Sequence, residues 1–515
     1  MTTGTLPTAR EARGVARGGL ANMAGAALAG ATGVVVTWIV ARSLGHQQAG
    51  AFFTATAAFV LAGGLAKLGT NTGLVYWPAR LRSTGESRLL GTCLRAGLLP
   101  VAVFSLVLAA AMVLLAPWIA RYTAHGSSAV LTEHTTALRV LAVFLPLQAL
   151  TDALLTVTRG YRRMRPTVLL DRLLRSSLQL VAVGAAGIAS LWAAASLPIF
   201  AAAWVAPYLP VALLSAYAAR SAFEKGRPAD AVSTRSERLR IRREFWRFTG
   251  PRALAAVAQL ALQRVDVLLV AALGGLGAAA VYAVAGRFVV LIQFANQGVS
   301  QSVQPRLAEA LSTGDRDAAN RLYQVATGWL VLVTWPICLL VIFFAPYYLG
   351  FFGDGYRSGA PVVVVLAGAM LVATGCGMVD MVLAMAGRTS ANLANVLVAL
   401  AVTIGLDVLL IPRWGALGAA AGLACAVVAN NLLPLAQIHH AARLHPFGPG
   451  TRAAVLLTTA CFGALPAAVT ALAGSGPAAL ASAVALAVPA FLAGAWLLRD
   501  RLALAAFTRR NQEES

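Results

Sequence analysis

Charged residues are scarce in this sequence, and acidic ones are scarcer than basic ones. Only 12% of the 515 residues are charged, while 59% are hydrophobic and the mean hydropathy is +0.75. A soluble protein of this length would need many more charged residues to cover its surface. Apolar runs of about 20 residues, long enough to cross a bilayer core, instead recur from Leu20 to Leu498. The composition excludes an ordinary soluble globule and predicts a multi-pass membrane protein.

Paired cysteines and enzyme motifs are missing as well. All five cysteines lie in apolar segments and none forms a C-x-x-C pair, so we interpret them as small hydrophobic residues. We find no metal-ligand pair, nucleophile elbow or phosphate loop. A membrane-bound glycan polymerase or ligase would need a large outer loop for its site, and no predicted outer loop exceeds roughly 20 residues. The sequence therefore favours a protein that is not an enzyme and needs no cofactor or metal.

The shortage of acidic residues leaves a formal charge of +22, which raises the question of nucleic-acid binding. The placement of the charges argues against it. Outside the predicted spans, all Lys and Arg residues but four lie on one side of the membrane, and the exceptions are Arg42, Arg121, Arg357 and Arg413. Such asymmetry follows the positive-inside rule, so we expect both termini in the cytoplasm and no nucleic-acid partner.

The apolar runs predict about fourteen transmembrane helices in two groups. Six make an N-lobe over residues 20–219, at about 20–41, 49–77, 90–117, 135–158, 167–189 and 191–219. Eight more lie at about 249–272, 277–305, 324–346, 360–386, 391–411, 416–438, 452–473 and 477–498. We expect a cytoplasmic segment at 1–19, a basic linker at 220–247, a C-lobe at 248–446, two C-terminal helices within 447–499 and a cytoplasmic tail at 500–515.

The two groups resemble each other. At one constant shift, Leu44-Gly45 aligns with Leu273-Gly274, Phe59 with Phe288, and Gly69 with Gly298. Six spans separate the copies, so both run in the same direction and the repeat is parallel. Transporter folds are often built from such repeats around a central site.

Polar side chains inside the spans are the candidate site, because a charge at the bilayer centre costs about 2.5–3.5 kcal/mol unless it is paired or hydrated. Lys67 shares a helix face with Thr70 and Asn71 and has no carboxylate one turn away. Two further polar stripes are predicted on the seventh and eighth spans. They consist of Arg252, Gln259, Gln263 and Asp266, and of Gln293, Gln297, Ser300 and Gln304. We expect these stripes to line a water-filled cavity between the halves.

Several of these charges allow two interpretations. Asp266 and Arg287 flank one hairpin, so they either pair to hold it together or face the cavity. Arg264, also a candidate for the cavity, lies off the main stripe, where it either serves the first partner helix or reaches outward. Asp380 and Asp407 are lone carboxylates in or near spans, and each either binds a proton or sodium ion in coupling or makes a local polar contact.

The basic stretch from Arg238 to Arg247 contains Phe245-Trp246. This composition suits a helix lying on an anionic inner leaflet. We favour a plain positive-inside loop, because large cytoplasmic loops of such proteins are basic.

Two groups of residues carry a resemblance to a known family. Val40-Ala41-Arg42-Ser43-Leu44-Gly45, with Gly50-Ala51-Phe52-Phe53 and Leu68-Gly69-Thr70, resembles the first two helices of bacterial polysaccharide flippases. Asp266-Val267-Leu268-Leu269 and Val281-Tyr282-Ala283-Val284-Ala285-Gly286-Arg287-Phe288 resemble the seventh and eighth. The chain is thus similar to the O-antigen and exopolysaccharide flippase branch of the multidrug, oligosaccharidyl-lipid and polysaccharide exporter superfamily.

The resemblance implies two six-helix lobes around a V-shaped cavity, two extra C-terminal helices and a location in the bacterial cytoplasmic membrane. It implies a flippase that moves a polyprenyl-pyrophosphate-linked oligosaccharide to the outer leaflet during cell-surface polysaccharide biosynthesis. Only Asp266 and Arg287 match positions that are usually polar in this branch. Multidrug exporters coupled to cations and lipid II flippases share the architecture, so both remain open as alternatives. The expected partners are the lipid-linked glycan, membrane lipids and a proton or sodium ion.

Overall fold

A computed structural model describes residues 9–123, 128–161, 163–194, 196–226, 234–474 and 476–503, with side chains from residue 25 onward. Within these ranges every regular element is a helix and there is no strand, which confirms the all-α class. Parts of the predicted N-terminal segment (1–8), linker (227–233) and C-terminal tail (504–515) lie outside the described residues.

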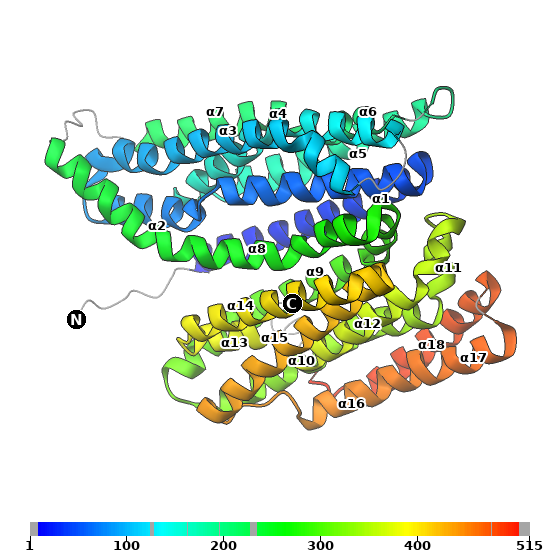
Figure 1. Cartoon of the computed structure of the whole chain (residues 1–515). Helices are drawn as coiled ribbons and strands as arrows, with labels where there is room; N and C mark the ends of the chain where they lie inside the picture. Colours follow the sequence, from blue (N-terminus) through cyan, green and yellow to red (C-terminus); the bar gives the residue numbers. More distant parts are fainter. Residues whose placement is uncertain are drawn as a thin grey trace. The chain divides into compact units, whose positions relative to one another are not determined.

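The chain forms two compact units, Met1–Arg264 and Val265–Ser515, and we describe each by itself. In the first unit α4 packs against both α3 and α7 (Figure 1). Its elements are α1 (Ala9–Ala66), α2 (Thr70–Ser83), η1 (Ser87–Leu89), α3 (Leu90–Thr123), α4 (Ser128–Gly160), the π-helical turn η2 (Thr167–Arg175), α5 (Ser176–Ala189), α6 (Leu197–Val205), α7 (Tyr208–Gly226) and the first part of α8 (Arg235–Ala285).

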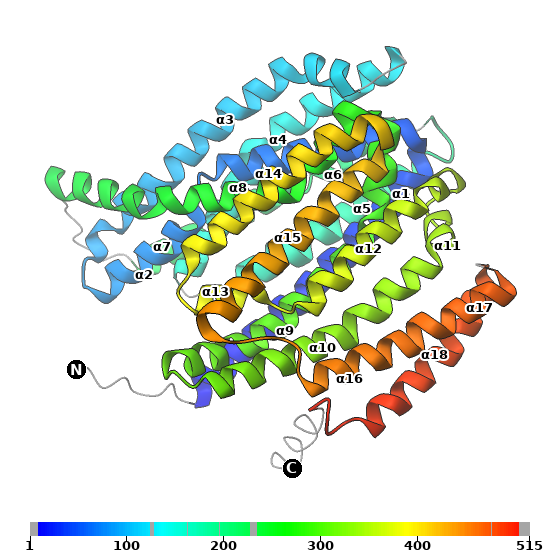
Figure 2. The ribbon, with the colours of Figure 1, turned by 60° about the horizontal axis from the view of Figure 1, so that its bottom comes forward.

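In the second unit α17 and α18 lie side by side, and α16 packs along α10 (Figure 2). Its core gathers buried side chains of α9, α10, α13 and α15, among them Leu307, Tyr323, Val382 and Ile438. After α8 its elements are α9 (Arg287–Ser312), α10 (Arg316–Phe343), α11 (Ala345–Gly350), η3 (Asp354–Gly359), α12 (Ala360–Gly375), α13 (Val379–Met385), α14 (Thr389–Trp414), α15 (Ala416–Ala442), α16 (Pro449–Thr458), η4 (Thr459–Ala464), α17 (Leu465–Ala473) and α18 (Pro477–Leu497).

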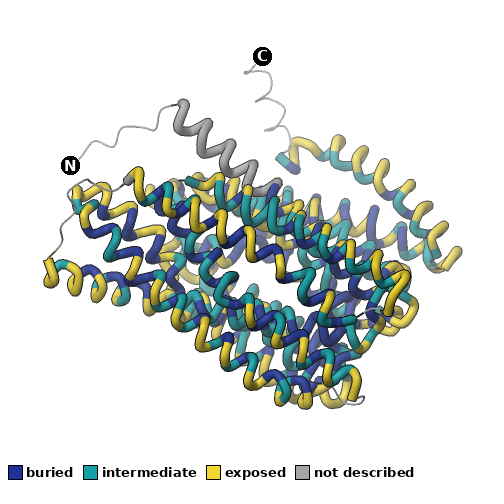
Figure 3. Tube along the Cα trace, turned by 90° about the horizontal axis from the view of Figure 1, so that it is seen from above, coloured by how far each residue is buried: buried dark blue, intermediate teal, exposed yellow. Residues whose placement is uncertain are grey.

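Large apolar side chains lie on the outside of both units. Exposed positions recur along the lengths of the helices and not only at their ends (Figure 3). Leu114, Trp192 and Leu472 are examples, at 77%, 80% and 90% exposed. A soluble monomer rarely exposes so much contiguous apolar surface, whereas a bilayer solvates it. The exposed surface therefore agrees with a multi-pass membrane protein.

Among the described residues, eleven helical segments are long and apolar enough to cross a membrane. Two features account for the difference between these eleven segments and the fourteen predicted spans. Gly25–Ser83 and Arg235–Ser312 each hold two predicted spans, and the fifth predicted span, Thr167–Ala189, is not among the eleven. The fifth span carries Asp171, Arg172 and Arg175 in its first part.

The predicted repeat appears in how each unit joins its first two spans. The chain turns at Gly45, with φ 71° and ψ 175°, and again at Gly275, with φ 84° and ψ 170°. Both dihedral pairs lie in a region that is essentially restricted to glycine. The alignment pairs Gly45 with Gly274, whereas the turn in the second half lies at Gly275. The two halves therefore share the same kind of joint, displaced by one residue in the second half.

The boundary between the units differs from the predicted linker at 220–247. The described part of that stretch is helical, because α7 continues to Gly226 and α8 begins at Arg235. The early part of α8 then packs on the first unit: Phe245 is fully buried and Trp246 Nε1 donates to the Ala96 carbonyl at 3.2 Å. These two aromatic side chains therefore anchor α8 to α3.

Four predicted spans are interrupted in the structure. The span at 49–77 breaks between Ala66 and Thr70, and those at 191–219, 277–305 and 360–386 break near Ala206, Gly286 and Gly377. Continuous apolar sequence predicts length but does not show where backbone geometry changes. In membrane proteins, non-helical backbone at depth is tolerated only where protein or a hydrated cavity surrounds it.

The break after Ala66 requires glycine at position 69. Leu68 and Gly69 have φ values of 48° and 67°, in the left-handed region. A Cβ atom on Gly69 would collide with the Cα atom of Ala253 in α8. This glycine thus allows both the turn and the close approach of α8.

Replacement of Gly69 by alanine should destabilise the protein by about 2–4 kcal/mol, because left-handed strain and overpacking add. Thermal unfolding of the purified protein in detergent measures the loss. Gly184→Ala is the matched control, since a Cβ atom there meets nothing within 4 Å. Equal melting temperatures for the two variants would contradict this account of the break.

Candidate functional site

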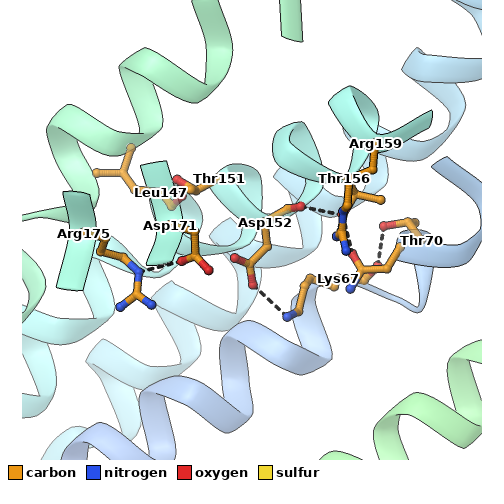
Figure 4. A network of polar contacts seen from close by, with 10 residues as sticks. Lys67, Thr70, Leu147, Thr151, Asp152, Thr156, Arg159, Asp171 and Arg175 are labelled. Atoms are coloured by element: carbon orange, nitrogen blue, oxygen red, sulfur yellow. Dashed lines mark hydrogen bonds and ion pairs between the residues drawn. The ribbon is translucent and has the colours of Figure 1, made fainter. Parts of the chain in front are cut away.

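Lys67 lies at the helix break, where it forms an ion pair that the sequence analysis did not anticipate. Its Nζ atom is 2.8 Å from Asp152 Oδ2 on α4, 85 residues away in the chain (Figure 4). The two side chains are 23% and 29% exposed. Because the local sequence offers no carboxylate near Lys67, only the packing of α4 against α1 and α2 supplies one. The pair is half-buried and accessible from outside the unit.

Hydrogen bonds extend this pair along α4. The Thr156 hydroxyl donates to the Asp152 carbonyl at 2.7 Å and approaches Asn71 Oδ1 at 3.3 Å. Arg159 Nη2 donates to the same hydroxyl at 2.6 Å. Asn71, predicted to share a face with Lys67, therefore joins the same network, which adds the cation Arg159.

A second ion pair lies in the π-helical turn η2. Arg175 Nε donates to Asp171 Oδ1 at 2.7 Å and Arg175 Nη1 donates to Gln179 Oε1 at 3.0 Å. The guanidinium carbon also lies 5.3 Å from the centre of the Tyr208 ring. π-Helical turns are rare and occur frequently at functional sites. These residues were missed because their span reads as apolar overall, although three charged residues in its first part, Asp171, Arg172 and Arg175, were a usable sequence signal.

The polar groups of the first unit form one cluster with excess positive charge. Arg159 interacts electrostatically with Asp152, Asp171 and Arg172. The cluster, which we call the cationic cluster, contains four cations and two carboxylates. Its charged members are Lys67, Arg159, Arg172, Arg175, Asp152 and Asp171. Such a set favours an anionic group that reaches it, because some cationic charge is left over after internal pairing.

The predicted glutamine stripes are exposed on their own units. Gln259 and Gln263, one turn apart on α8, are exposed in the first unit, and Arg264 is half-buried. Gln293, Gln297 and Gln304 are exposed on α9 in the second unit. Amides at such positions can hydrogen-bond sugar hydroxyls in place of water. That both stripes line one cavity between the halves stays a prediction.

Asp266 differs from the rest of its predicted stripe. Its side chain is buried, Tyr282 OH donates to Oδ2 at 2.6 Å, and the Val267 amide donates to Oδ1 at 2.8 Å. The helical projection placed Asp266 beside exposed Gln259 and Gln263, but the hairpin after Gly275 brings Tyr282 over it. Arg287 is half-buried at the start of α9, and its pairing with Asp266 stays a prediction.

The two lone carboxylates have opposite environments. Asp380 is exposed at the start of α13, so nothing forces it to find a partner. Asp407 on α14 is 0% exposed, and among the described residues neither carboxylate oxygen has a hydrogen-bond partner. Asp266 lies near enough for its charge to act on Asp407. A buried carboxylate without a partner is costly in its charged form. That Asp407 takes part in ion coupling stays a prediction.

Comparisons with known proteins decide the family. The family model described as polysaccharide biosynthesis protein matches residues 15–311, more than half of the chain. The chain belongs to the polysaccharide biosynthesis protein family. A second model, MatE, matches residues 251–412, and together they place the chain in the multidrug, oligosaccharidyl-lipid and polysaccharide exporter superfamily. No curated protein sequence matches it.

Solved structures of this superfamily share the fold. Lipid II flippase MurJ in an inward closed conformation is 13% identical with a TM-score of 0.72, covering 92% of this chain and 98% of MurJ. An inward-facing multidrug resistance MATE family transporter is 15% identical with a TM-score of 0.61, covering 85% and 95%. A transporter from Pyrococcus furiosus is also 15% identical, with a TM-score of 0.54 and coverage of 86% and 96%. This chain is thus a multi-pass membrane protein with the fold of these transporters.

The Lys67–Asp152 pair should show strong coupling in a double-mutant cycle. Lys67→Met or Asp152→Leu alone leaves a half-buried charge without its partner, whereas the double variant removes both charges. We expect a coupling free energy of about 1–3 kcal/mol from thermal or denaturant unfolding.

The control cycle uses Arg220 and Glu224, which are 2.7 Å apart but 80% and 57% exposed. That pair should show no measurable coupling. Additive effects of Lys67→Met and Asp152→Leu would mean that the ion pair does not stabilise the first unit.

Proposed function

We propose that the protein is a flippase that moves a polyprenyl-pyrophosphate-linked oligosaccharide from the cytoplasmic to the outer leaflet during cell-surface polysaccharide biosynthesis. The observation that carries the proposal is the cationic cluster, which holds four cations against two carboxylates at a break in a membrane helix. Family membership supports the pathway, and the MurJ fold supports a lipid-linked substrate.

The chemistry of the first unit suits such a substrate. A pyrophosphate brings negative charge that Lys67 and Arg159 attract, and it competes with Asp152 for Lys67. The exposed amides of Gln259 and Gln263 offer donors and acceptors for sugar hydroxyls. Moving two negative charges outward gains about 5 kcal/mol at an inside-negative potential of 100 mV, at about 2.3 kcal/mol per charge. The membrane potential then drives flipping in one direction, without an enzymatic step.

The orientation follows from the basic loops. With most Lys and Arg residues on one side, both termini lie in the cytoplasm. Family membership supports the bacterial cytoplasmic membrane as the proposed location.

A multidrug exporter is the second candidate, because MATE transporters share the fold. A site for organic cations needs accessible carboxylates and aromatic faces. In the described residues Asp266 and Asp407 are buried, and accessible Asp152 is already paired with Lys67. Asp380 is exposed but stands alone at the start of α13, apart from the cationic cluster. The balance of charge favours an anionic headgroup.

The double variant Lys67→Met/Asp152→Leu should keep the fold and lose transport at least tenfold, because it removes the pair without leaving an isolated charge. Liposomes containing a fluorescent polyprenyl-pyrophosphate oligosaccharide, with chemical quenching of the outer leaflet, measure transfer with and without an imposed potential.

Arg121→Gln is the matched control, because this exposed cation lies in the last turn of α3, is not part of the cationic cluster and should leave transfer unchanged. Wild-type transfer rates in the double variant would overturn the role of the cationic cluster. Ethidium efflux in place of glycan transfer would favour the multidrug alternative.

Asp407 is the proposed coupling carboxylate. Asp407→Asn should remove the dependence of transport on an imposed proton or sodium gradient, because an amide neither releases a proton nor attracts a cation as a carboxylate does. The response of transfer to each gradient is compared between the variant and Asp380→Asn, whose carboxylate is exposed and should be dispensable. Loss of gradient dependence in Asp380→Asn with no change in Asp407→Asn would reverse the assignment.

A further inference from the structure

A second concentration of arginines lies away from the cationic cluster. A cavity of about 560 Å³ in the first unit is lined by residues of η1, α3, α4, α7 and α8. Three arginines line one end of it, namely Arg88, Arg95 and Arg238. No acidic residue is among its lining residues. Its size is within the range of small-molecule sites, about 300–1,000 Å³.

The other end of the cavity is apolar. One face of α3 lines the cavity with Arg95, Leu98, Leu99 and Ala102, which follow one another at helical spacing. The lining therefore changes from cationic at Arg95 to apolar at Ala102. From Arg95 to Ala102 the helix rises about 10 Å, most of the way through one leaflet's half of a ~30 Å hydrocarbon core. The exposed side chains of Val103 and Leu106 continue this apolar surface along α3. The cavity thus joins a cationic entrance to a lipid-facing stripe.

Two of the arginines are available to a ligand. Arg88 Nη2 pairs with Glu237 Oε1 at 2.6 Å, but among the described residues the guanidinium groups of Arg95 and Arg238 have no hydrogen-bond or ion-pair partner. A second ion pair, Arg240 Nη2 with Glu86 Oε1 at 2.8 Å, fixes the start of α8 beside the loop before α3. The pairs therefore hold Arg238 at the entrance while Arg95 and Arg238 keep their charge uncompensated.

This cavity is separate from the proposed substrate site. Leu150 lines it from α4, whereas Asp152 on the same helix binds Lys67. Residues two positions apart on an α-helix are separated by a rotation of about 200° around its axis. The side chains of Leu150 and Asp152 therefore point to opposite faces of α4. A lipid in this cavity would not occupy the place of a headgroup at Lys67.

We propose that this cavity binds one anionic glycerophospholipid of the cytoplasmic leaflet. The headgroup phosphate contacts Arg95 and Arg238, and one acyl chain lies along Leu98, Leu99 and Val103. Basic pockets between transmembrane helices on the cytoplasmic side recognise anionic headgroups in this way. The lipid bridges α3 and the start of α8, which the Arg88–Glu237 and Arg240–Glu86 pairs also join.

The test uses native mass spectrometry of the purified full chain with added phosphatidylglycerol, phosphatidylcholine of the same chains, or a polyprenyl phosphate. The wild-type protein should retain one phosphatidylglycerol at concentrations that leave phosphatidylcholine unbound. Arg95→Gln/Arg238→Gln should weaken that binding at least tenfold. Gly91→Leu should do the same without a change of charge, since a Cβ atom there points toward Phe223 at 3.6 Å and a longer side chain fills the cavity.

The matched control is Arg242→Gln/Arg243→Gln, which removes two exposed charges from the same helix outside the cavity lining. It should change the affinity less than twofold. An equal loss of phosphatidylglycerol affinity in the control variant, or unchanged affinity in Gly91→Leu, would mean that the lipid is attracted to the basic surface in general. Either result would overturn the site. Preferential retention of polyprenyl phosphate would assign the cavity to an isoprenoid lipid and overturn it too.

Each variant is checked by thermal unfolding without added lipid. If the double arginine variant does not fold, Arg238→Gln alone at its exposed position should weaken phosphatidylglycerol binding two- to fivefold. Wild-type affinity in that single variant would overturn the site.

Discussion

A charge inside a bilayer needs a partner, and Lys67 has one only because α4 brings Asp152 to the end of α1. The same position is where the helix breaks, with the Lys67 carbonyl accepting from the Thr70 amide and hydroxyl. Gly69 then lets α8 approach closely. Backbone break, ion pair and helix contact therefore depend on one another, and the rest of the cationic cluster extends from this point.

The two units use intramembrane charge differently. The first unit collects cations around Asp152 and Asp171, and its ion pairs are half-buried and accessible. The second unit buries Asp266 and Asp407, with Tyr282 satisfying the first and no described group satisfying the second. This difference underlies the roles that we propose, namely an anionic headgroup at the cationic cluster and a proton or cation at Asp407.

Arginines outside the spans have a structural role beyond setting orientation. Arg88 and Arg240 fix the start of α8 to the loop before α3 through ion pairs with Glu237 and Glu86. Trp246 adds a hydrogen bond to the α3 backbone in the same region. Because these contacts tie the beginning of the second half of the sequence to the first unit, the structural boundary falls at Arg264, after the basic stretch and inside a span.

The sequence by itself determined the all-α membrane class, the parallel repeat with its glycine joints and the exposed glutamines of α8 and α9. Those features depend on composition and on periodicity within a single helix, which are local properties. The family resemblance agreed with the family that the comparisons show. The resemblance did not identify the residues of the cationic cluster beyond Lys67 and Asn71.

Only the tertiary structure decided which polar groups meet. Asp152 is 85 residues from Lys67, and Tyr282 covers Asp266 across a hairpin, so neither contact can be read from helical spacing. Likewise, the basic stretch does not show that Phe245 is buried and that Trp246 donates a hydrogen bond to α3. A helix pattern shows which residues share a face, whereas the packing of neighbouring helices decides whether that face meets protein, lipid or water.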